Sequence, residues 1–283
     1  MDAPLTTVPD PSLFCKMQRV AARGAIAVVH ERGRTRLRNL LQDGAAKIRL
    51  PSVEADPLEA ILINTAGGLT GGDRIAWEVA IGARASLALT TQACEKAYRS
   101  AGGHAEVTCR IEAGPEARIA WLPQETIVFD RSALRRTIDV DLEATSEALI
   151  VEATIFGRRA MGETVAQASF RDRWRVRVDG RLVHAEDFAI GPEVAAVLAN
   201  RPVTGGGAAV ASVLLVAENA EERLDAVRAV IGEENGASAW RVGGTGKLLA
   251  RLVASDGYLL RRRLAPLVAL LNGRAGLPKT WSL

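Results

Sequence analysis

The sequence predicts a mainly β fold of antiparallel or stacked strands, with helices confined to the last third of the chain. From about residue 16 to residue 190, apolar side chains alternate with polar or small ones, which is the two-residue period of half-buried strands. These runs recur roughly every 10 to 14 residues. They leave no room for the long helices that connect the strands of a parallel βαβ sheet, which argues against a Rossmann fold.

Glycine- and proline-containing turns separate the predicted strands. The clearest alternation lies at residues 75–81, 107–111, 119–121, 138–142 and 149–156. Asp179-Gly180 stands between two further alternating arms, and this dipeptide is a strong signal for a two-residue hairpin turn. In the arm before it, arginines alternate with apolar residues at 171–178, which predicts an edge or surface strand with a solvated arginine face.

Two glycine-rich segments invite comparison with phosphate-binding loops, and neither matches. GGLTGGD at 67–73 precedes a strand, so no helix N-terminus is offered to an anion. Its four glycines predict backbone with φ > 0 or a very close approach of another segment, which would hold Asp73 on a stiff turn. RVGGTGKL at 241–248 has Arg and Leu where a P-loop needs Gly and Ser or Thr, and it predicts a tight connection between two strands.

The last third of the chain predicts helices among a few strands, a βαβ-like portion packed on the β body. Residues 192–200 form a short helix, and Asn219 with Glu222 reads as a capping box that opens an amphipathic helix ended by Asn235-Gly236. A second helix spans about 257–271, with a leucine stripe at 260, 264, 267 and 271 and a kink or restart at Pro266. Strands are expected between them at 238–242 and 248–254.

Composition predicts one cytoplasmic globular domain over residues 1–283, with residues 1–15 as a flexible N-terminal segment. Hydrophobic residues make up 48% and charged residues 24% of the 283, as in ordinary globular proteins. We expect no membrane segment, because the longest apolar run, 208–217, is about half a bilayer span. The N-terminus resembles no signal peptide, and Cys15, Cys94 and Cys109 cannot form a disulfide framework, which fits a reducing compartment.

Nucleic-acid binding is not expected either. The formal net charge is only +3, and acidic residues are interspersed with the arginines almost everywhere.

Candidate chemistry rests on single carboxylates. No G-x-S-x-G elbow occurs, and the three histidines and three cysteines form no close cluster. Cys94, near Lys96, is a reactive thiolate or, as we favour, a small buried apolar residue. Isolated acids stand beside glycine or in apolar strands, namely Asp73, Glu152, Glu163 and Glu186. Glu152, inside LIVEATIF, must find a partner, a water or a metal ion.

Four segments in order resemble the urease accessory protein D family, also called UreH. The first is NTAGGLTGGD followed by TTQACEKAYRS within 64–100, similar to the family pattern PPGGxxGGD and TTQxxxKxYRS. LPQETIVFDRSALRR at 122–136, GRRAMGE at 157–163 and PKTW at 278–281 follow. The chain departs from the pattern at Thr65-Ala66, where prolines are usual, and at Lys279, which replaces an arginine.

The resemblance implies a non-enzymatic chaperone that helps install nickel in urease. It implies a mainly β fold of strands stacked in a helix-like arrangement, with two helices packed on it. The expected partners are apo-urease and the urease accessory proteins F and G, the latter a nickel-carrying GTPase, with a possible dimer within the accessory complex. We guess that the exposed residues of the C-terminal helix and the PKTWSL tail contact the F protein, while Trp281 could instead be a local packing anchor.

The resemblance also implies an internal polar passage for nickel(II), with no tightly bound cofactor. Carried over by motif, the passage is lined by Asp73, Glu152 and Glu186, with Glu163 as a further member. Scarce histidine and cysteine fit transit, because imidazole and thiolate would hold nickel tightly while carboxylates and waters release it. The alternatives are a β-rich hydrolase or lyase that uses Asp73 and a glutamate as an acid–base pair, and an arginine-mediated nucleic-acid binder.

Overall fold

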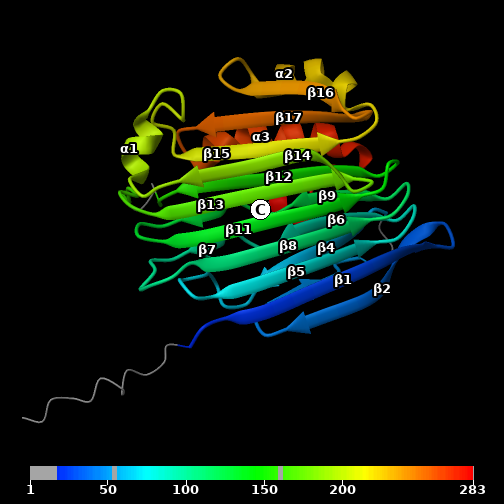
Figure 1. Cartoon of the computed structure of the whole chain (residues 1–283), viewed down its shortest axis with the longest axis horizontal. Helices are drawn as coiled ribbons and strands as arrows, with labels where there is room; N and C mark the ends of the chain where they lie inside the picture. Colours follow the sequence, from blue (N-terminus) through cyan, green and yellow to red (C-terminus); the bar gives the residue numbers. More distant parts are fainter. Residues whose placement is uncertain (1–17, 53–55, 159–161, 283) are drawn as a thin grey trace, which may run out of the picture.

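The computed structural model describes residues 18–52, 56–158 and 162–282, and in these ranges two β-sheets face each other. The predicted flexible segment, residues 1–15, lies outside the described residues. Figure 1 shows β1 and β2 at one end of the stack of strands and β16 with α2 at the other. The mainly β prediction is therefore confirmed.

Each sheet gathers strands from distant parts of the chain. The seven-stranded sheet contains, in spatial order, β14 (Arg181–Ile190), β13 (Ser169–Val178), β11 (Ala133–Leu142), β8 (Ala105–Ala113), β5 (Arg74–Ile81), β1 (Ala21–Glu31) and β2 (Arg34–Asp43). The ten-stranded sheet contains β16 (Gly236–Val242), β17 (Thr245–Ala254), β15 (Ala209–Val216), β12 (Glu147–Phe156), β9 (Arg118–Leu122), β6 (Ser86–Thr91), β4 (Leu58–Asn64) and β3 (Ala46–Arg49). Two short strands, β10 (Thr126–Val128) and β7 (Glu95–Ala97), continue it beside β12.

The chain passes back and forth between the sheets, and this explains how closely spaced strands can be parallel. β5, β8 and β11 lie in one sheet, while β6, β9 and β12, which alternate with them along the chain, lie in the other. The neighbours within each set pair in parallel. A strand of the opposite sheet thus supplies the crossover that a helix supplies in a βαβ unit. The stacked alternative is correct, and antiparallel pairing occurs elsewhere, as in β1–β2 and β13–β14 of one sheet and β12–β15, β15–β17 and β16–β17 of the other.

Two hydrophobic cores share the ten-stranded sheet. One lies between the sheets, and the other lies between the outer face of the ten-stranded sheet and helices α2 (Leu224–Ile231) and α3 (Gly257–Asn272). Strand β12 serves both, because its side chains alternate: Ile150 belongs to the first core, and Leu149 and Val151 belong to the second.

The predicted helices are present, with differences at their ends. Helix α1 covers Val194–Ala199, and α3 runs through Pro266 without a restart. The predicted leucine stripe of α3 is buried. The capping box is wrong, since Asn219 makes no side-chain cap and precedes a 3₁₀ turn, Ala220–Arg223, which leads into α2. Helix α2 ends at Ile231, with Gly232 as its C-cap, rather than at the predicted Asn235-Gly236.

The turn predictions are confirmed. Asp179 and Gly180 have φ of 48° and 75° in the β13–β14 hairpin. The second glycine-rich segment is the β16–β17 hairpin turn. In the first, a Cβ on Gly71 would lie 2.0 Å from Ser100 Oγ, so the loop needs glycine for close approach.

The arginines of β13 face away from the first core, as expected, although β14 rather than β13 forms the sheet edge.

Among the described residues, no helix has both the length and the apolar character needed to cross a bilayer.

Candidate functional site

The space between the two sheets contains a group of buried charges. Strand alternation places Arg136 of β11 and Asp172 of β13 on the inner face of one sheet, and Glu152 of β12 on the inner face of the other. All three side chains are at least nine-tenths buried. Charges so deep in an apolar core require partners, and these three partner one another.

One guanidinium joins both carboxylates. Arg136 Nε and Nη2 donate to the two oxygens of Asp172 at 3.0 and 2.6 Å, which is the bidentate geometry of a strong pair. Arg136 Nη1 lies 2.5 Å from Glu152 Oε2 and donates to Thr126 Oγ1 at 2.9 Å. The other oxygen of Glu152 accepts the indole N–H of Trp121 at 2.8 Å. We call Arg136, Glu152 and Asp172 the central triad.

Burial and neighbouring charges shift the pKa values of Glu152 and Arg136. Burial raises the pKa of Glu152 to about 7; Arg136 opposes this rise, and the charge of Asp172 adds to it. Burial also works against the charge of Arg136, but Asp172 and Glu152 outweigh it and raise the pKa of that guanidinium.

A small cavity adjoins the central triad on the β14 side. Its volume is about 90 Å³, and Glu152, Asp172 and Glu186 line it together with Trp174 and Arg251. Glu186 of β14 pairs with Arg251 of β17 across the gap between the sheets. The indole N–H of the fully buried Trp174 has no hydrogen-bond partner among the described residues. The cavity is thus polar on several sides and large enough for water.

The structure brings two of the four predicted site residues together, Glu152 and Glu186. Asp73 is buried elsewhere: its oxygens accept the backbone N–H groups of Val20 and Thr70, each at 2.8 Å. It braces the glycine-rich turn, as the stiff-turn prediction requires, and its place on a nickel passage stays a prediction.

Glu163 lies apart from the cavity. It accepts Arg158 Nε at 2.7 Å and the N–H of Asp130 at 3.3 Å. Burial works against its charge, but Arg158 outweighs this and lowers the pKa of Glu163. Its part in a passage also stays a prediction.

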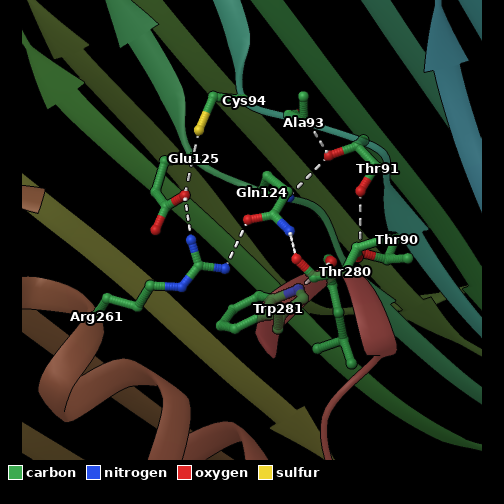
Figure 2. Close-up of polar contacts among 10 residues, drawn as sticks. Thr90, Thr91, Ala93, Cys94, Gln124, Glu125, Arg261, Thr280 and Trp281 are labelled. Carbon is green, nitrogen blue, oxygen red and sulfur yellow. Dashed lines mark hydrogen bonds and ion pairs between the residues drawn. The ribbon is translucent and has the colours of Figure 1, made fainter. Parts of the chain in front are cut away.

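A second polar network joins the LPQE segment to helix α3 and the chain end (Figure 2). Arg261 of α3 donates to Gln124 Oε1 at 2.6 Å and to Glu125 Oε2 at 3.2 Å. Gln124 Nε2 donates to the carbonyl of Thr280 at 2.6 Å, and the indole N–H of Trp281 donates to the carbonyl of Leu122 at 3.0 Å. We call this network, with the Trp281 ring under Arg261, the C-terminal clamp.

The C-terminal clamp bears on two predictions, one for Trp281 and one for Cys94. Trp281 is 5% exposed, which confirms it as a packing anchor. Cys94 donates its S–H toward Glu125 at 3.4 Å. Burial, reinforced by the charge of Glu125, raises the pKa of the Cys94 thiol to about 11, so the side chain is a neutral thiol at pH 7.

Arg136, Asp172 and Arg251 complete the site, and the sequence analysis did not single them out. The signal for the first two was present, because Arg136 stands between Leu134 and Ile138, and Asp172 between Phe170 and Trp174, at positions whose neighbours face the core. Among the described residues, no group of three or more His, Cys, Asp or Glu side chains is arranged to hold a metal ion.

Comparison with known proteins gives one consistent result. The family model described as "UreD urease accessory protein" matches residues 21–282. A "Urease accessory protein UreD" from Mesorhizobium japonicum is 62% identical over 266 residues, which cover 94% of this chain and 95% of the relative. A protein of the same name from Brucella suis is 56% identical over 276 residues, covering 98% and 99%. A "Urease accessory protein UreD 1" from Brucella anthropi is 58% identical over 269 residues, covering 94% and 95%.

Proposed function

This chain belongs to the UreD family of urease accessory proteins, and from that premise we propose that it delivers nickel to apo-urease as a non-enzymatic chaperone. Membership supports a role in urease maturation. The proposal adds that the chain acts in the cytoplasm as a scaffold between urease and the F and G accessory proteins, within a complex that can be dimeric. Nickel(II) is its cargo rather than a resident cofactor.

The observation that carries the nickel proposal is the cavity between the sheets. Glu152, Asp172 and Glu186 reach it from three strands of two sheets. Oxygen ligands and water hold first-row divalent ions less tightly than imidazole or thiolate do, so a carboxylate-lined route permits release. A nickel path through Glu152 and Glu186 is the simplest use of this arrangement, with Asp73 and Glu163 as further predicted points on it.

The test replaces the two cavity glutamates without changing their shape. Glu152→Gln and Glu186→Gln are expressed with the urease genes and the other accessory genes in cells that lack the native copy of this gene. We expect each variant to lower the nickel content and the activity of purified urease at least fivefold, while pull-down recovers the accessory complex intact.

Glu112→Gln is the matched control, since Glu112 lies exposed on the outer face of β8 in the same fold. It should load urease like the wild type. Normal nickel content of urease with both cavity variants would overturn the nickel path, and assembly of active urease without this chain would overturn the chaperone role.

A further inference from the structure

A line of polar side chains leads from β4 through β7, β10 and β11 to β12 and β13. Asn64 donates to Glu95 at 3.1 Å, and Glu95 is the strand partner of Thr126. Thr126 accepts from Arg136, which leads to Glu152 and Asp172 and so to the cavity beside Glu186. A separate cavity of about 150 Å³ lies at the far end, lined in part by Asn64 and Glu95.

The guanidinium of Arg136 stands at the middle of this line, where it obstructs a cation. It contacts the oxygens of two carboxylates at 2.5–3.0 Å, and these oxygens are the atoms that would ligate a divalent ion. A second positive charge at this point would meet an occupied ligand set and a like charge in a region of low dielectric.

The surroundings of the pair also suit a hydrated ion. The adjoining cavity offers space for water, and the indole N–H of Trp174, a fully buried residue that lines it, has no hydrogen-bond partner among the described residues. Hard and borderline divalent ions complete their coordination with such waters when the protein supplies only one or two carboxylates.

We propose that Glu152 and Asp172 form a latent divalent-cation site that Arg136 occupies as a tethered competitor. This inference rests on the proposed passage of nickel, and it identifies the residue that keeps the passage from retaining its cargo. With Arg136 in place, an ion binds only when the guanidinium shifts, so affinity is low and release is easy. Without Arg136, the two buried carboxyl groups lose their counter-ion and must take up a proton or a cation, and a divalent cation can then bind where the guanidinium stood.

The experiment measures nickel binding by the full chain, fused to a solubility partner and free of any polyhistidine tag. Equilibrium dialysis against NiCl₂ compares the wild type with Arg136→Gln. We expect the variant to retain one additional nickel ion with at least tenfold higher affinity. Arg136→Gln combined with Glu152→Gln and Asp172→Asn should lose this gain.

A control variant and a refolding measurement keep the result decisive. Arg135→Gln removes the neighbouring, exposed arginine of β11 and should bind nickel like the wild type. If Arg136→Gln does not fold alone, refolding is followed by circular dichroism with and without NiCl₂, and nickel should restore the fold of the single variant. A folded Arg136→Gln with wild-type nickel affinity, or an unfolded one that nickel does not restore, would overturn the proposal.

The outcome is separable from that of the proposed function. Nickel retention by the isolated chain requires no urease, whereas the proposed function is read from urease loaded with the Glu152 and Glu186 variants. Normal urease loading with those variants would remove the function and leave a latent cation site. Absence of the nickel gain would remove the tethered competitor alone.

Discussion

Cys94 lies beside a carboxylate, although its sequence neighbour Lys96 suggested a cation that could activate it. Its S–H points to Glu125, and the same carboxylate accepts from Arg261 on the opposite side. Burial and the negative charge of Glu125 both stabilise the protonated thiol. The family motif that contains Cys94 therefore contributes to packing and hydrogen bonding at this point, and not a nucleophile.

Alkylation of Cys94 should accordingly be slow and steeply dependent on pH. A pKa of about 11 leaves on the order of a thousandth of the thiol ionised at pH 8, so iodoacetamide should react roughly 100-fold more slowly than with an unhindered cysteine. The logarithm of the rate should keep rising with pH between 7 and 10, whereas a free thiol levels off near 9. Mass spectrometry of a Cys15→Ser, Cys109→Ser background isolates the site.

Glu125→Gln and Arg261→Met should shift this profile in opposite directions. Loss of the carboxylate removes a charge that raises the pKa of Cys94, so alkylation at pH 8 should accelerate. Loss of the guanidinium removes a charge that lowers it, so alkylation should slow. A plateau near pH 9 in the parent chain would contradict the assignment.

Asp73 should prove to be a determinant of stability whatever its part in nickel transfer. Asp73→Ala leaves two part-buried N–H groups, of Val20 and Thr70, without their acceptor, at a cost of about 1–3 kcal/mol in the free energy of unfolding. Asp73→Asn keeps one acceptor and should cost less. Urea denaturation measures both, and Asp43→Ala, an exposed acid at the end of β2, should change stability by less than about 0.5 kcal/mol. Unchanged stability of Asp73→Ala would refute the bracing role.

The candidate site could be predicted only in part from single residues. Glu152 was conspicuous because it is an acid in an apolar strand. Its counter-ion Arg136 could not be identified from the sequence. Arg136 lies in a different sheet, and contacts between sheets cannot be read from spacing along the chain. Asp172 was overlooked because the arginines on the same strand face outward and give the strand the pattern of a solvated arginine face. Pairing of buried charges is a property of the assembled sheets.

The C-terminal clamp acts at the level of elements, because it fixes α3 and the chain end to the ten-stranded sheet. The Trp281 ring packs in the second core, its N–H reaches the carbonyl of Leu122, and Arg261 covers its face. Thr280 adds contacts to Gln124 and Thr90. The tail that we expected to meet a partner thus has its principal side chain engaged within its own chain.

Trp281→Ala should loosen this end of the molecule by about 3 kcal/mol, because it removes a large buried side chain and a hydrogen bond. Trp281→Phe keeps most of the ring and should lose about 1 kcal/mol. Hydrogen exchange of the α3 amides, followed by mass spectrometry, reports the loosening, with Trp240→Ala at a half-exposed position as the control. Equal exchange of the α3 amides in the parent chain, Trp281→Ala and Trp240→Ala would rule out the clamp.

Element prediction succeeded where a local pattern decides the structure. Alternation placed the strands, and the leucine stripe placed α3. It failed where the same residues suit two local conformations. At Asn219, a 3₁₀ turn forms in place of the predicted capping box. Strand direction was likewise undetermined, because the same spacing suits an antiparallel hairpin and a return through the other sheet.

At the scale of the whole molecule, the ten-stranded sheet unites the two cores. Strands β9, β12 and β15 place side chains in both, so loss of either core exposes one face of the same strands. The parallel neighbours among β5, β8 and β11, and among β6, β9 and β12, are separated along the chain by at least one strand of the opposite sheet, so the two sheets are interleaved in sequence. This arrangement disfavours a state in which one of the two cores is folded and the other is unfolded.

Unfolding in urea should therefore be a single transition, in agreement with the prediction of one domain. Ile138→Ala in the inter-sheet core and Leu264→Ala in the helix-side core remove fully buried side chains, and each should cost about 2–5 kcal/mol. Both should move the whole transition to lower urea, with tryptophan fluorescence and far-ultraviolet circular dichroism coinciding. Arg135→Gln, on the solvent face, should leave the midpoint unchanged. Two separate transitions, with each substitution moving only one of them, would divide the chain into two folding units at the ten-stranded sheet.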